Sequence, residues 1–116
     1  MDQTFPKQEH LCGSAAVAQL MSSGKTLSEG CLRCKYLRRT GDEGPVRMLV
    51  SVPKRLFKRA VRRNLLKRRI RESYRRQKGN LPAGLDLMLV YTSAEVLPYA
   101  EIDAHLRALV EKLAHA

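Results

Sequence analysis

Basic side chains gather in one short stretch of this sequence, at a density suited to binding phosphate groups. Residues 53–78 hold 13 of the chain's 22 lysines and arginines but only one acid, Glu72. Outside this stretch nine basic residues are offset by ten acids, so the formal net charge of +11 arises entirely here. A charge that served only solubility would be spread over the surface, whereas a concentrated one is typical of a polyanion-binding site.

Such a block of like charges can also be a solvated helix face or a disordered basic tail. The spacing favours an ordered helix, because Leu66, Ile70 and Ser73 share one side of a 3.6-residue wheel, with Tyr74 at its edge. The opposite side is polar and basic: Asn64, Lys67, Arg68, Arg71 and Arg75. We therefore predict an amphipathic helix over 57–77, with an apolar face for a core and a cationic face for a partner.

The remaining charged residues of this helix lie around the two faces. Three arginines are closer to the apolar side, where they can bury their stems and keep their charged heads in water: Arg62, Arg63 and Arg69. Glu72 is four residues from both Arg68 and Arg76, so we expect it to form an ion pair with one of them.

The rest of the chain supplies the elements that would position this helix. Composition and periodicity predict a first helix over 14–22, a last helix that begins at Pro98, and strands over 30–37, 46–52 and 85–91. Residues 40–45 and 78–84 are rich in turn formers. The order helix, strand, strand, helix, strand, helix predicts an α+β fold, an α/β two-layer sandwich with helices on a small sheet.

Length and composition are those of a single globular domain. The chain has 116 residues, of which 44% are apolar, enough for one core. No stretch approaches the roughly 20 apolar residues of a membrane span, and the first ten residues lack a secretory signal. We therefore expect a cytoplasmic protein with no membrane partner, whose three cysteines are reduced thiols.

The cysteines also allow a different hypothesis, a zinc site. The residue types and spacing of His10, Cys12, Cys31 and Cys34 are ones that zinc could use. If Cys31 and Cys34 lie on one strand, however, residues three apart point to opposite faces of the sheet. Separate free thiols are therefore favoured, and metal binding by these four residues stays open.

The basic helix carries a motif of mixed composition. The run from Phe57 to Tyr74 resembles the signature helix of the ribonuclease P protein family, Ala-Val-x-Arg-Asn-Arg-x-Lys-Arg followed by x-x-Arg-[Glu/Asp]-x-aromatic. The chain matches this signature at Ala60, Val61, Arg63, Asn64, Lys67, Arg68, Arg71, Glu72 and Tyr74. Upstream, 49–55 resembles the family's strand and basic turn, and 4–11 resembles its common opening.

This resemblance implies a more detailed fold. The family has a four-stranded mixed sheet with three helices, in which the basic helix forms an unusual left-handed βαβ crossover. A short strand near 27–29 would supply the fourth strand. The chain would then be one ribonuclease P protein domain over 1–116, with 1–10 as a flexible N-terminal extension.

The resemblance also implies a function. The chain would be the protein subunit of ribonuclease P, which binds the catalytic RNA subunit and the 5′ leader of precursor tRNA and supports removal of that leader. Hydrolysis would be carried out by the RNA subunit with Mg²⁺, so we expect no catalytic residue, metal ligand, firmly bound cofactor or obligate protein partner. The implied RNA-binding residues are Arg63, Asn64, Lys67, Arg68, Arg71, Arg75, Lys54 and Arg55.

A second implied site is a cleft between the first helix and the sheet, which would hold the single-stranded leader. Its matching residues are Val17, Met21, Lys35 and Tyr36. The family usually has aromatic residues at the first two positions, and stacking on a base contributes about 1–3 kcal/mol. With aliphatic side chains there, leader binding would be weaker or shifted towards Tyr36. Val17, Met21 and Tyr36 could equally be core residues.

One further departure lies inside the motif, and two alternative functions stay open. Leu65 replaces the second arginine of the motif and removes a phosphate contact, which Arg69 could restore. The helix could also serve a generic DNA or ribosomal RNA binding module, or the chain could be a self-sufficient nuclease. A DNA reader usually has a helix-turn-helix or a dimer seam, whereas predicted strands flank this helix on both sides.

Overall fold

The computed structural model describes residues 14–38 and 46–115, which form three α-helices, one 3-10 helix and one four-stranded sheet. In chain order the elements are α1 (Ser14–Ser23), β1 (Lys25–Glu29), β2 (Leu32–Arg38), β3 (Arg47–Ser51), α2 (Ala60–Gln77), η2 (Lys78–Asn80), β4 (Leu85–Tyr91) and α3 (Tyr99–Ala114). The expected α+β fold is confirmed, and β1 is the expected fourth strand. The predicted flexible extension over 1–10 lies outside the described residues.

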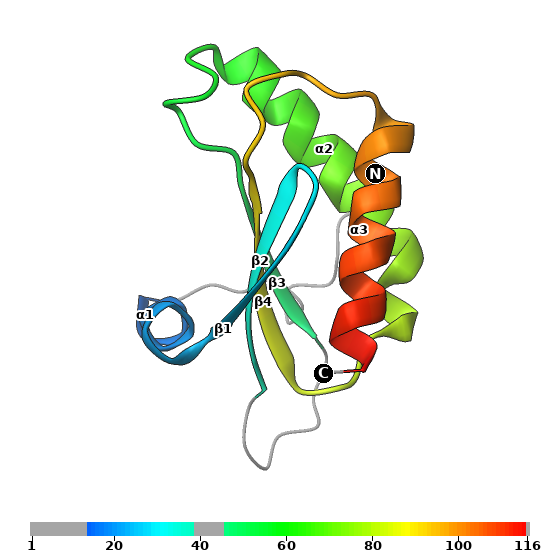
Figure 1. Ribbon diagram of the computed structural model, residues 1–116. Coiled ribbons are helices and arrows are strands. Elements are labelled where there is room, and N and C mark those ends of the chain that lie inside the picture. Colours follow the sequence, from blue (N-terminus) through cyan, green and yellow to red (C-terminus); the bar gives the residue numbers. More distant parts are fainter. Residues whose placement is uncertain (1–13, 39–45, 116) are drawn as a thin grey trace.

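The sheet is mixed, with the strand order β1-β2-β4-β3. β1 with β2 and β2 with β4 are antiparallel pairs, whereas β3 runs parallel to its neighbour β4. The chain therefore leaves β3, passes through α2 and returns beside β3, which makes α2 the helix of a βαβ crossover (Figure 1). Its left-handedness stays a prediction of the resemblance.

The strand register separates the two faces of the sheet. Leu27, Cys34, Leu89 and Val50 are partners in one row across the four strands, so their side chains share a face. α2 and α3 cover this face and enclose the main core, whereas α1 lies on the other face (Figure 1). α1 is held there by Leu20, whose side chain is fully buried. The second face is otherwise only partly covered.

α2 begins at Ala60, so the prediction that it starts near residue 57 is wrong. The backbone N–H groups of Leu56 and Phe57 both donate to the carbonyl of Pro53, which forms a turn, and Arg59 is extended. The buried Phe57 ring lies 5.9 Å from the ring of Tyr91. The aromatic side chain reaches the core from the turn, and this prevents the helix from starting earlier. Residues 53–59 are called the basic turn below.

The amphipathic wheel of α2 is confirmed. Its buried residues are Leu66, Ile70, Ser73, Tyr74 and Gln77. The two polar members, Ser73 and Gln77, both donate hydrogen bonds to the carboxylate of Asp103 on α3, at 2.6 and 3.1 Å. Arg107 donates to the same carboxylate at 2.8 Å. This polar cluster joins α2 to α3 and fixes which face of α2 is turned outwards.

Candidate nucleic-acid interface

The outward face of α2 carries polar and basic groups that are available for a ligand. Asn64, Arg68 and Arg71 are exposed and Lys67 is half-buried. None of these four side chains makes a hydrogen bond or ion pair with any residue that the structure describes. Because the opposite face is fixed in the core, this face cannot turn inwards. Guanidinium groups in this position can form two parallel hydrogen bonds to a phosphate.

Arg75, which we predicted to bind RNA, is already engaged by an acid. Its guanidinium donates to both carboxylate oxygens of Glu72, at 3.2 and 2.7 Å, and Arg76 donates to the same group at 3.1 Å. The expected pairing of Glu72 with one of Arg68 and Arg76 is confirmed for Arg76, and Arg75 is an additional partner. The hydrogen bond from Arg75, with Arg76 beside it, holds the pKa of Glu72 below its usual value. The unpaired cations are therefore concentrated in the first two-thirds of α2.

Arg63 has a structural partner as well. Its Nη1 atom donates to the carbonyl oxygens of Phe57 and Lys58, at 2.7 and 2.9 Å. The side chain is half-buried and ties the start of α2 to the basic turn. Part of its hydrogen-bonding capacity is thus used within the protein, and the predicted fork onto phosphate is available only to its remaining N–H groups.

The basic turn presents four exposed cations beside the start of α2. Lys54 and Arg55 were expected here from the motif, and the structure places both at the surface. Lys58 and Arg59 are exposed too, and neither was expected in the interface because the helix was predicted to begin at residue 57. The bonds from Arg63 to the carbonyls of Phe57 and Lys58, and those within the turn to the carbonyl of Pro53, stabilise this segment. The candidate interface therefore extends from the basic turn along α2.

Arg69, suggested as a substitute for the arginine missing at Leu65, binds a backbone carbonyl. Its guanidinium donates to the carbonyl of Leu97, in the loop between β4 and α3. The same loop is bound by the hydroxyl of Tyr91, which donates to the carbonyl of Glu95 and accepts from the N–H of Leu97 at 3.2 Å. The bond to Leu97 uses one Nη atom of Arg69, so a phosphate contact in place of the missing arginine stays a prediction for its remaining N–H groups.

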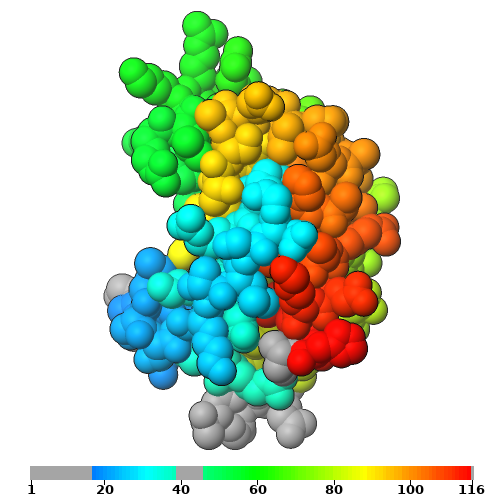
Figure 2. All heavy atoms as spheres, viewed as in Figure 1, coloured from blue at the N-terminus to red at the C-terminus, as the bar shows by residue number. Residues whose placement is uncertain are grey.

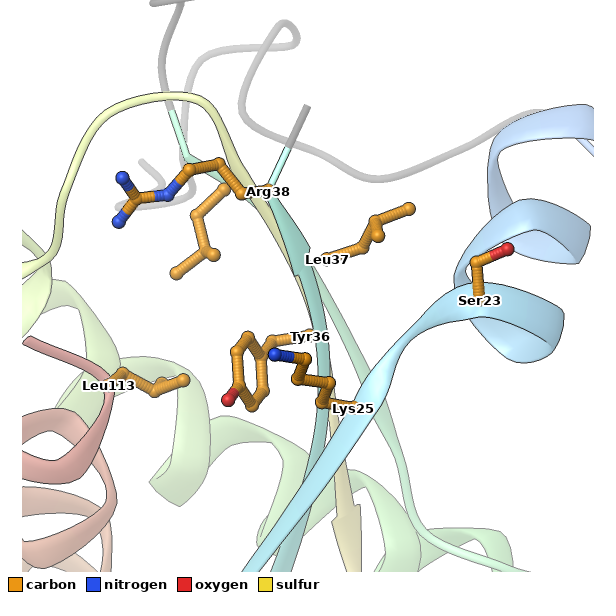
Figure 3. A pocket seen from close by; sticks show the side chains of 7 residues that line it. Ser23, Lys25, Tyr36, Leu37, Arg38 and Leu113 are labelled. Carbon is orange, nitrogen blue, oxygen red and sulfur yellow. The ribbon is translucent and has the colours of Figure 1, made fainter. Parts of the chain in front are cut away.

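The four predicted leader-cleft residues do not lie together. Lys35 and Tyr36 are neighbours on β2, so their side chains point to opposite faces of the sheet. Tyr36 points towards Leu113 of α3, and its predicted place in the cleft beside α1 is wrong (Figure 3). Lys35 shares the α1 face. Met21 is 48% exposed, so it is not a core residue, and Val17 is half-buried.

The surface is hollowed on the α1 side, between α1 and the basic turn with the start of α2 (Figure 2). The register places a row of Lys35, Met88 and Leu49 on this face of the sheet, and all three are half-buried. The next row includes Arg33, an exposed cation that the sequence analysis missed. The alternation of Arg33 and Lys35 along one strand was the signal that could have identified it.

The cysteine hypothesis is tested only in part, because His10 and Cys12 lie outside the described residues. Cys31 and Cys34 are both free and buried. Burial raises the pKa of the Cys34 thiol to about 12 and also raises that of Cys31, whose sulfur lies 3.1 Å from Nδ1 of His105. Within residues 14–38 and 46–115 no three histidine, cysteine or acidic side chains form a cluster that could hold a metal ion.

These features define a class of protein: a small α+β domain that turns one cationic helix outwards from a mixed sheet. The sequence model of the family described as Ribonuclease P matches residues 5–114, and the chain belongs to this family. None of the helices in the described part of the chain is long and apolar enough to cross a membrane.

Relatives and solved structures agree with this assignment. The ribonuclease P protein component of Petrotoga mobilis is 31% identical over 116 residues, which cover 96% of each chain. That of Chlorobaculum tepidum is 40% identical over 85 residues, 70% of this chain and 55% of the relative, so the match spans just over half of that protein. The fold is shared with the RNase P protein of Thermotoga maritima (TM-score 0.77, 24% identity, 90% and 96% covered) and a mutant of the Staphylococcus aureus protein (TM-score 0.81, 21% identity, 91% and 88% covered).

Proposed function

We propose that this chain is the protein subunit of ribonuclease P, and that it binds the catalytic RNA subunit through α2 and the basic turn. The observation that supports this most directly is the outward face of α2, where Asn64, Lys67, Arg68 and Arg71 have no partner among the described residues. Cations that neutralise phosphates release condensed counterions, which drives binding at low salt. RNA binding would therefore be strong and steeply dependent on salt.

The hollow beside α1 is the proposed site of the 5′ leader of precursor tRNA. Half-buried Met88 and Leu49 offer apolar contact to bases, and Lys35 and Arg33 offer charge to the sugar-phosphate chain. The exposed Met21 adds a polarizable thioether from α1. Without aromatic side chains on this face of the described strands, stacking would contribute less, and leader binding would depend more on these cations.

Hydrolysis in this proposal belongs to the RNA subunit with its bound Mg²⁺, and this chain contributes binding. The test is precursor tRNA cleavage at low salt with the RNA subunit alone, this protein alone, and both together. We expect no cleavage by the protein alone, slow cleavage by RNA at low Mg²⁺, and a lower Mg²⁺ requirement or tighter substrate binding with both.

The same experiment separates the alternatives. Cleavage by the protein alone would support a self-sufficient nuclease. The protein is a generic basic module if it leaves RNA-catalysed cleavage and substrate affinity unchanged. It would then bind unrelated duplex DNA or ribosomal RNA as tightly as it binds the RNA subunit. For substitutions of the cations on α2, the charge-matched control is Lys112→Ala, which removes one exposed cation of α3.

A further inference from the structure

A small pocket lies at the end of the sheet where Tyr36 and Leu113 point towards one another (Figure 3). The other lining residues are Leu85, the cations Lys25 and Arg38, and, at the edge of the sheet, Leu37 and Ser23. The cavity volume is about 180 Å³. Pockets for drug-sized ligands are roughly 300–1,000 Å³, so this one can enclose little more than one flat ring. Its aromatic ring and its two cations lie on the α3 side of the sheet, whereas Leu37 and Ser23 extend the lining around the edge of the sheet towards α1.

The lining of this pocket combines an apolar wall with unpaired positive charge. Leu85 and Leu113 are buried and Tyr36 is half-buried, so these three side chains form a fixed wall with one aromatic ring. Lys25 is the cross-strand partner of Tyr36, and Arg38 is two residues along β2, so both cations lie on the same face as the ring. Both are exposed, and no acid lines the pocket.

The side chains of both cations are without a partner in the part of the chain that the structure describes. Neither Lys25 nor Arg38 makes a hydrogen bond or an ion pair in the described structure, whereas Lys112 and Arg107 on nearby α3 are both ion-paired. α3 ends beside the pocket, and the partial negative charge of the helix dipole at this C-terminus would favour cations in this region. That attraction explains positive charge in general, but it does not require an aromatic ring or a cavity between the charges.

We propose that this pocket binds a single nucleotide, with the base against Tyr36 and the phosphate between Lys25 and Arg38. Stacking on an aromatic ring accepts any base, and charge-assisted hydrogen bonds from the two cations match a phosphate. The nucleotide is either free in solution or an unpaired residue of an RNA strand. This site goes beyond the proposed function, since its ring and its two cations belong neither to α2 nor to the row of Lys35, Met88 and Leu49 in the hollow beside α1.

The test is an NMR titration of the full chain, without any RNA subunit, with AMP, with a six-residue oligouridylate and with inorganic phosphate. We expect AMP and the oligonucleotide to shift the resonances of Tyr36, Leu85 and Leu113 in a saturable way. Lys25→Ala and Arg38→Ala should each weaken this binding by about tenfold, the effect of losing one charge-assisted contact. Tyr36→Leu keeps an apolar side chain and should weaken the binding of nucleotides but not that of phosphate.

The control is Lys112→Ala, which removes an exposed cation of α3 that does not line the pocket and should leave binding at these resonances unchanged. Tighter binding of AMP than of the oligonucleotide identifies a free nucleotide as the ligand, and the reverse identifies an RNA strand. The proposal is overturned if these resonances do not shift, if phosphate alone binds as tightly as AMP, or if Lys112→Ala weakens binding as much as Arg38→Ala. Thermal unfolding of each variant confirms that it is folded.

Discussion

Arginines in α2 have three different roles, although the sequence presents them as one basic block. Arg68 and Arg71 are exposed without partners in the described structure, Arg75 is ion-paired with Glu72, and Arg63 and Arg69 bind backbone carbonyls. Arg68 and Arg71, together with the exposed Arg62, carry charge that is fully available to a polyanion. The chemistry of a guanidinium group allows all of these roles, and its neighbours decide between them.

This division predicts unequal effects of arginine substitutions on RNA binding. Arg68→Ala and Arg71→Ala should each weaken binding of the RNA subunit and reduce the slope of log K against log salt by about one unit, one phosphate contact each. Arg75→Ala should have a smaller effect, since it also frees Glu72 from its closest partner. Filter binding across a salt series measures both quantities. Equal slopes for Arg68→Ala, Lys112→Ala and the unmodified protein would show that Arg68 does not contact phosphate.

Glu72 is predicted to weaken the interface that surrounds it. Glu72→Gln removes the negative charge that engages Arg75 and Arg76 and should increase RNA affinity, with a steeper salt slope by up to about one unit per released cation. The comparison is Glu111→Gln, an exposed acid on α3 with the same change in net charge. If both variants gain affinity equally, net charge and not the local ion pair is responsible.

At the scale of elements, α2 is held in place by α3 through buried polar contacts as well as apolar ones. Ser73 is fully buried and Gln77 is 5% exposed, and both satisfy their hydrogen bonds through each other and through Asp103. Leaving buried polar groups without partners is costly, so this cluster favours one rotation of α2 over others. The outward direction of the cationic face therefore depends on a residue of α3.

Asp103→Ala should destabilise the fold by about 1–3 kcal/mol, because Ser73 and Gln77 lose an acceptor. Partial burial raises the pKa of Asp103, but hydrogen bonds from Ser73, Arg107 and Gln77 together outweigh it and leave the pKa below its usual value. The stabilisation is therefore complete above the unfolded-state pKa of about 3.9 and is lost as the pH falls through the lower folded-state pKa.

Urea unfolding at pH 6 and at pH 3 measures both parts of this prediction. The unmodified protein should lose more stability than Asp103→Ala over this interval, because only it contains the titrating group. Glu111→Ala is the control on the same helix. A destabilisation of Asp103→Ala no larger than that of the control would mean that the cluster does not hold α2.

The turn between β1 and β2 depends on a glycine that contacts α3. Gly30 has a φ of +55°, and a Cβ atom there would lie 2.5 Å from the ring of His105. Nδ1 of that ring accepts the backbone N–H of Cys31 at 3.1 Å. Gly30→Ala should cost roughly 1–2 kcal/mol for the left-handed backbone, plus the cost of displacing the ring.

Gly79 is the matched control, because a Cβ atom there would have no neighbour within 4 Å and its φ is not positive. Gly79→Ala should therefore be almost neutral in thermal unfolding. Equal decreases in melting temperature for Gly30→Ala and Gly79→Ala would show that the contact between Gly30 and His105 does not constrain this turn.

For the whole molecule, the sheet separates two candidate binding regions that the sequence could not distinguish. The hollow beside α1 and the basic turn lie on one side, and the ring of Tyr36 with the two cations of its pocket lies on the other (Figures 2 and 3). Most of the positive charge is on α2 and the basic turn, while α3 exposes both signs of charge. The molecule thus has one strongly cationic side, which would direct how it docks on RNA.

The two proposed RNA contacts should be separable in binding assays. Lys35→Ala should weaken binding of leader-bearing precursor tRNA up to roughly tenfold, while binding of mature tRNA and of the RNA subunit is unchanged. Tyr36→Leu should not alter leader binding, since the Tyr36 side chain points to the α3 face, opposite to that of Lys35. If Tyr36→Leu abolishes the leader contribution and Lys35→Ala does not, the leader lies on the α3 side of the sheet.

The sequence by itself determined the amphipathic helix, the order of elements and the family, because all three depend on patterns that are local in the chain. Leu66 and Ile70 recur with the period of a helix, so their burial needed no knowledge of the neighbours. The motif around Asn64 and Arg68 belongs to the same helix, and the family assignment rested on it.

Only the tertiary structure decided which of these residues remain available to a partner. Arg63, Arg69 and Arg75 donate hydrogen bonds to acceptors within the protein. The acceptors of Arg63 and Arg69 lie outside α2, so the periodicity of the helix could not predict these contacts. Tyr36 was assigned to the wrong face because the phase of a strand depends on its register with β1 and β4. Charge and spacing show what side chains can do, whereas packing between distant segments determines which groups are left to do it.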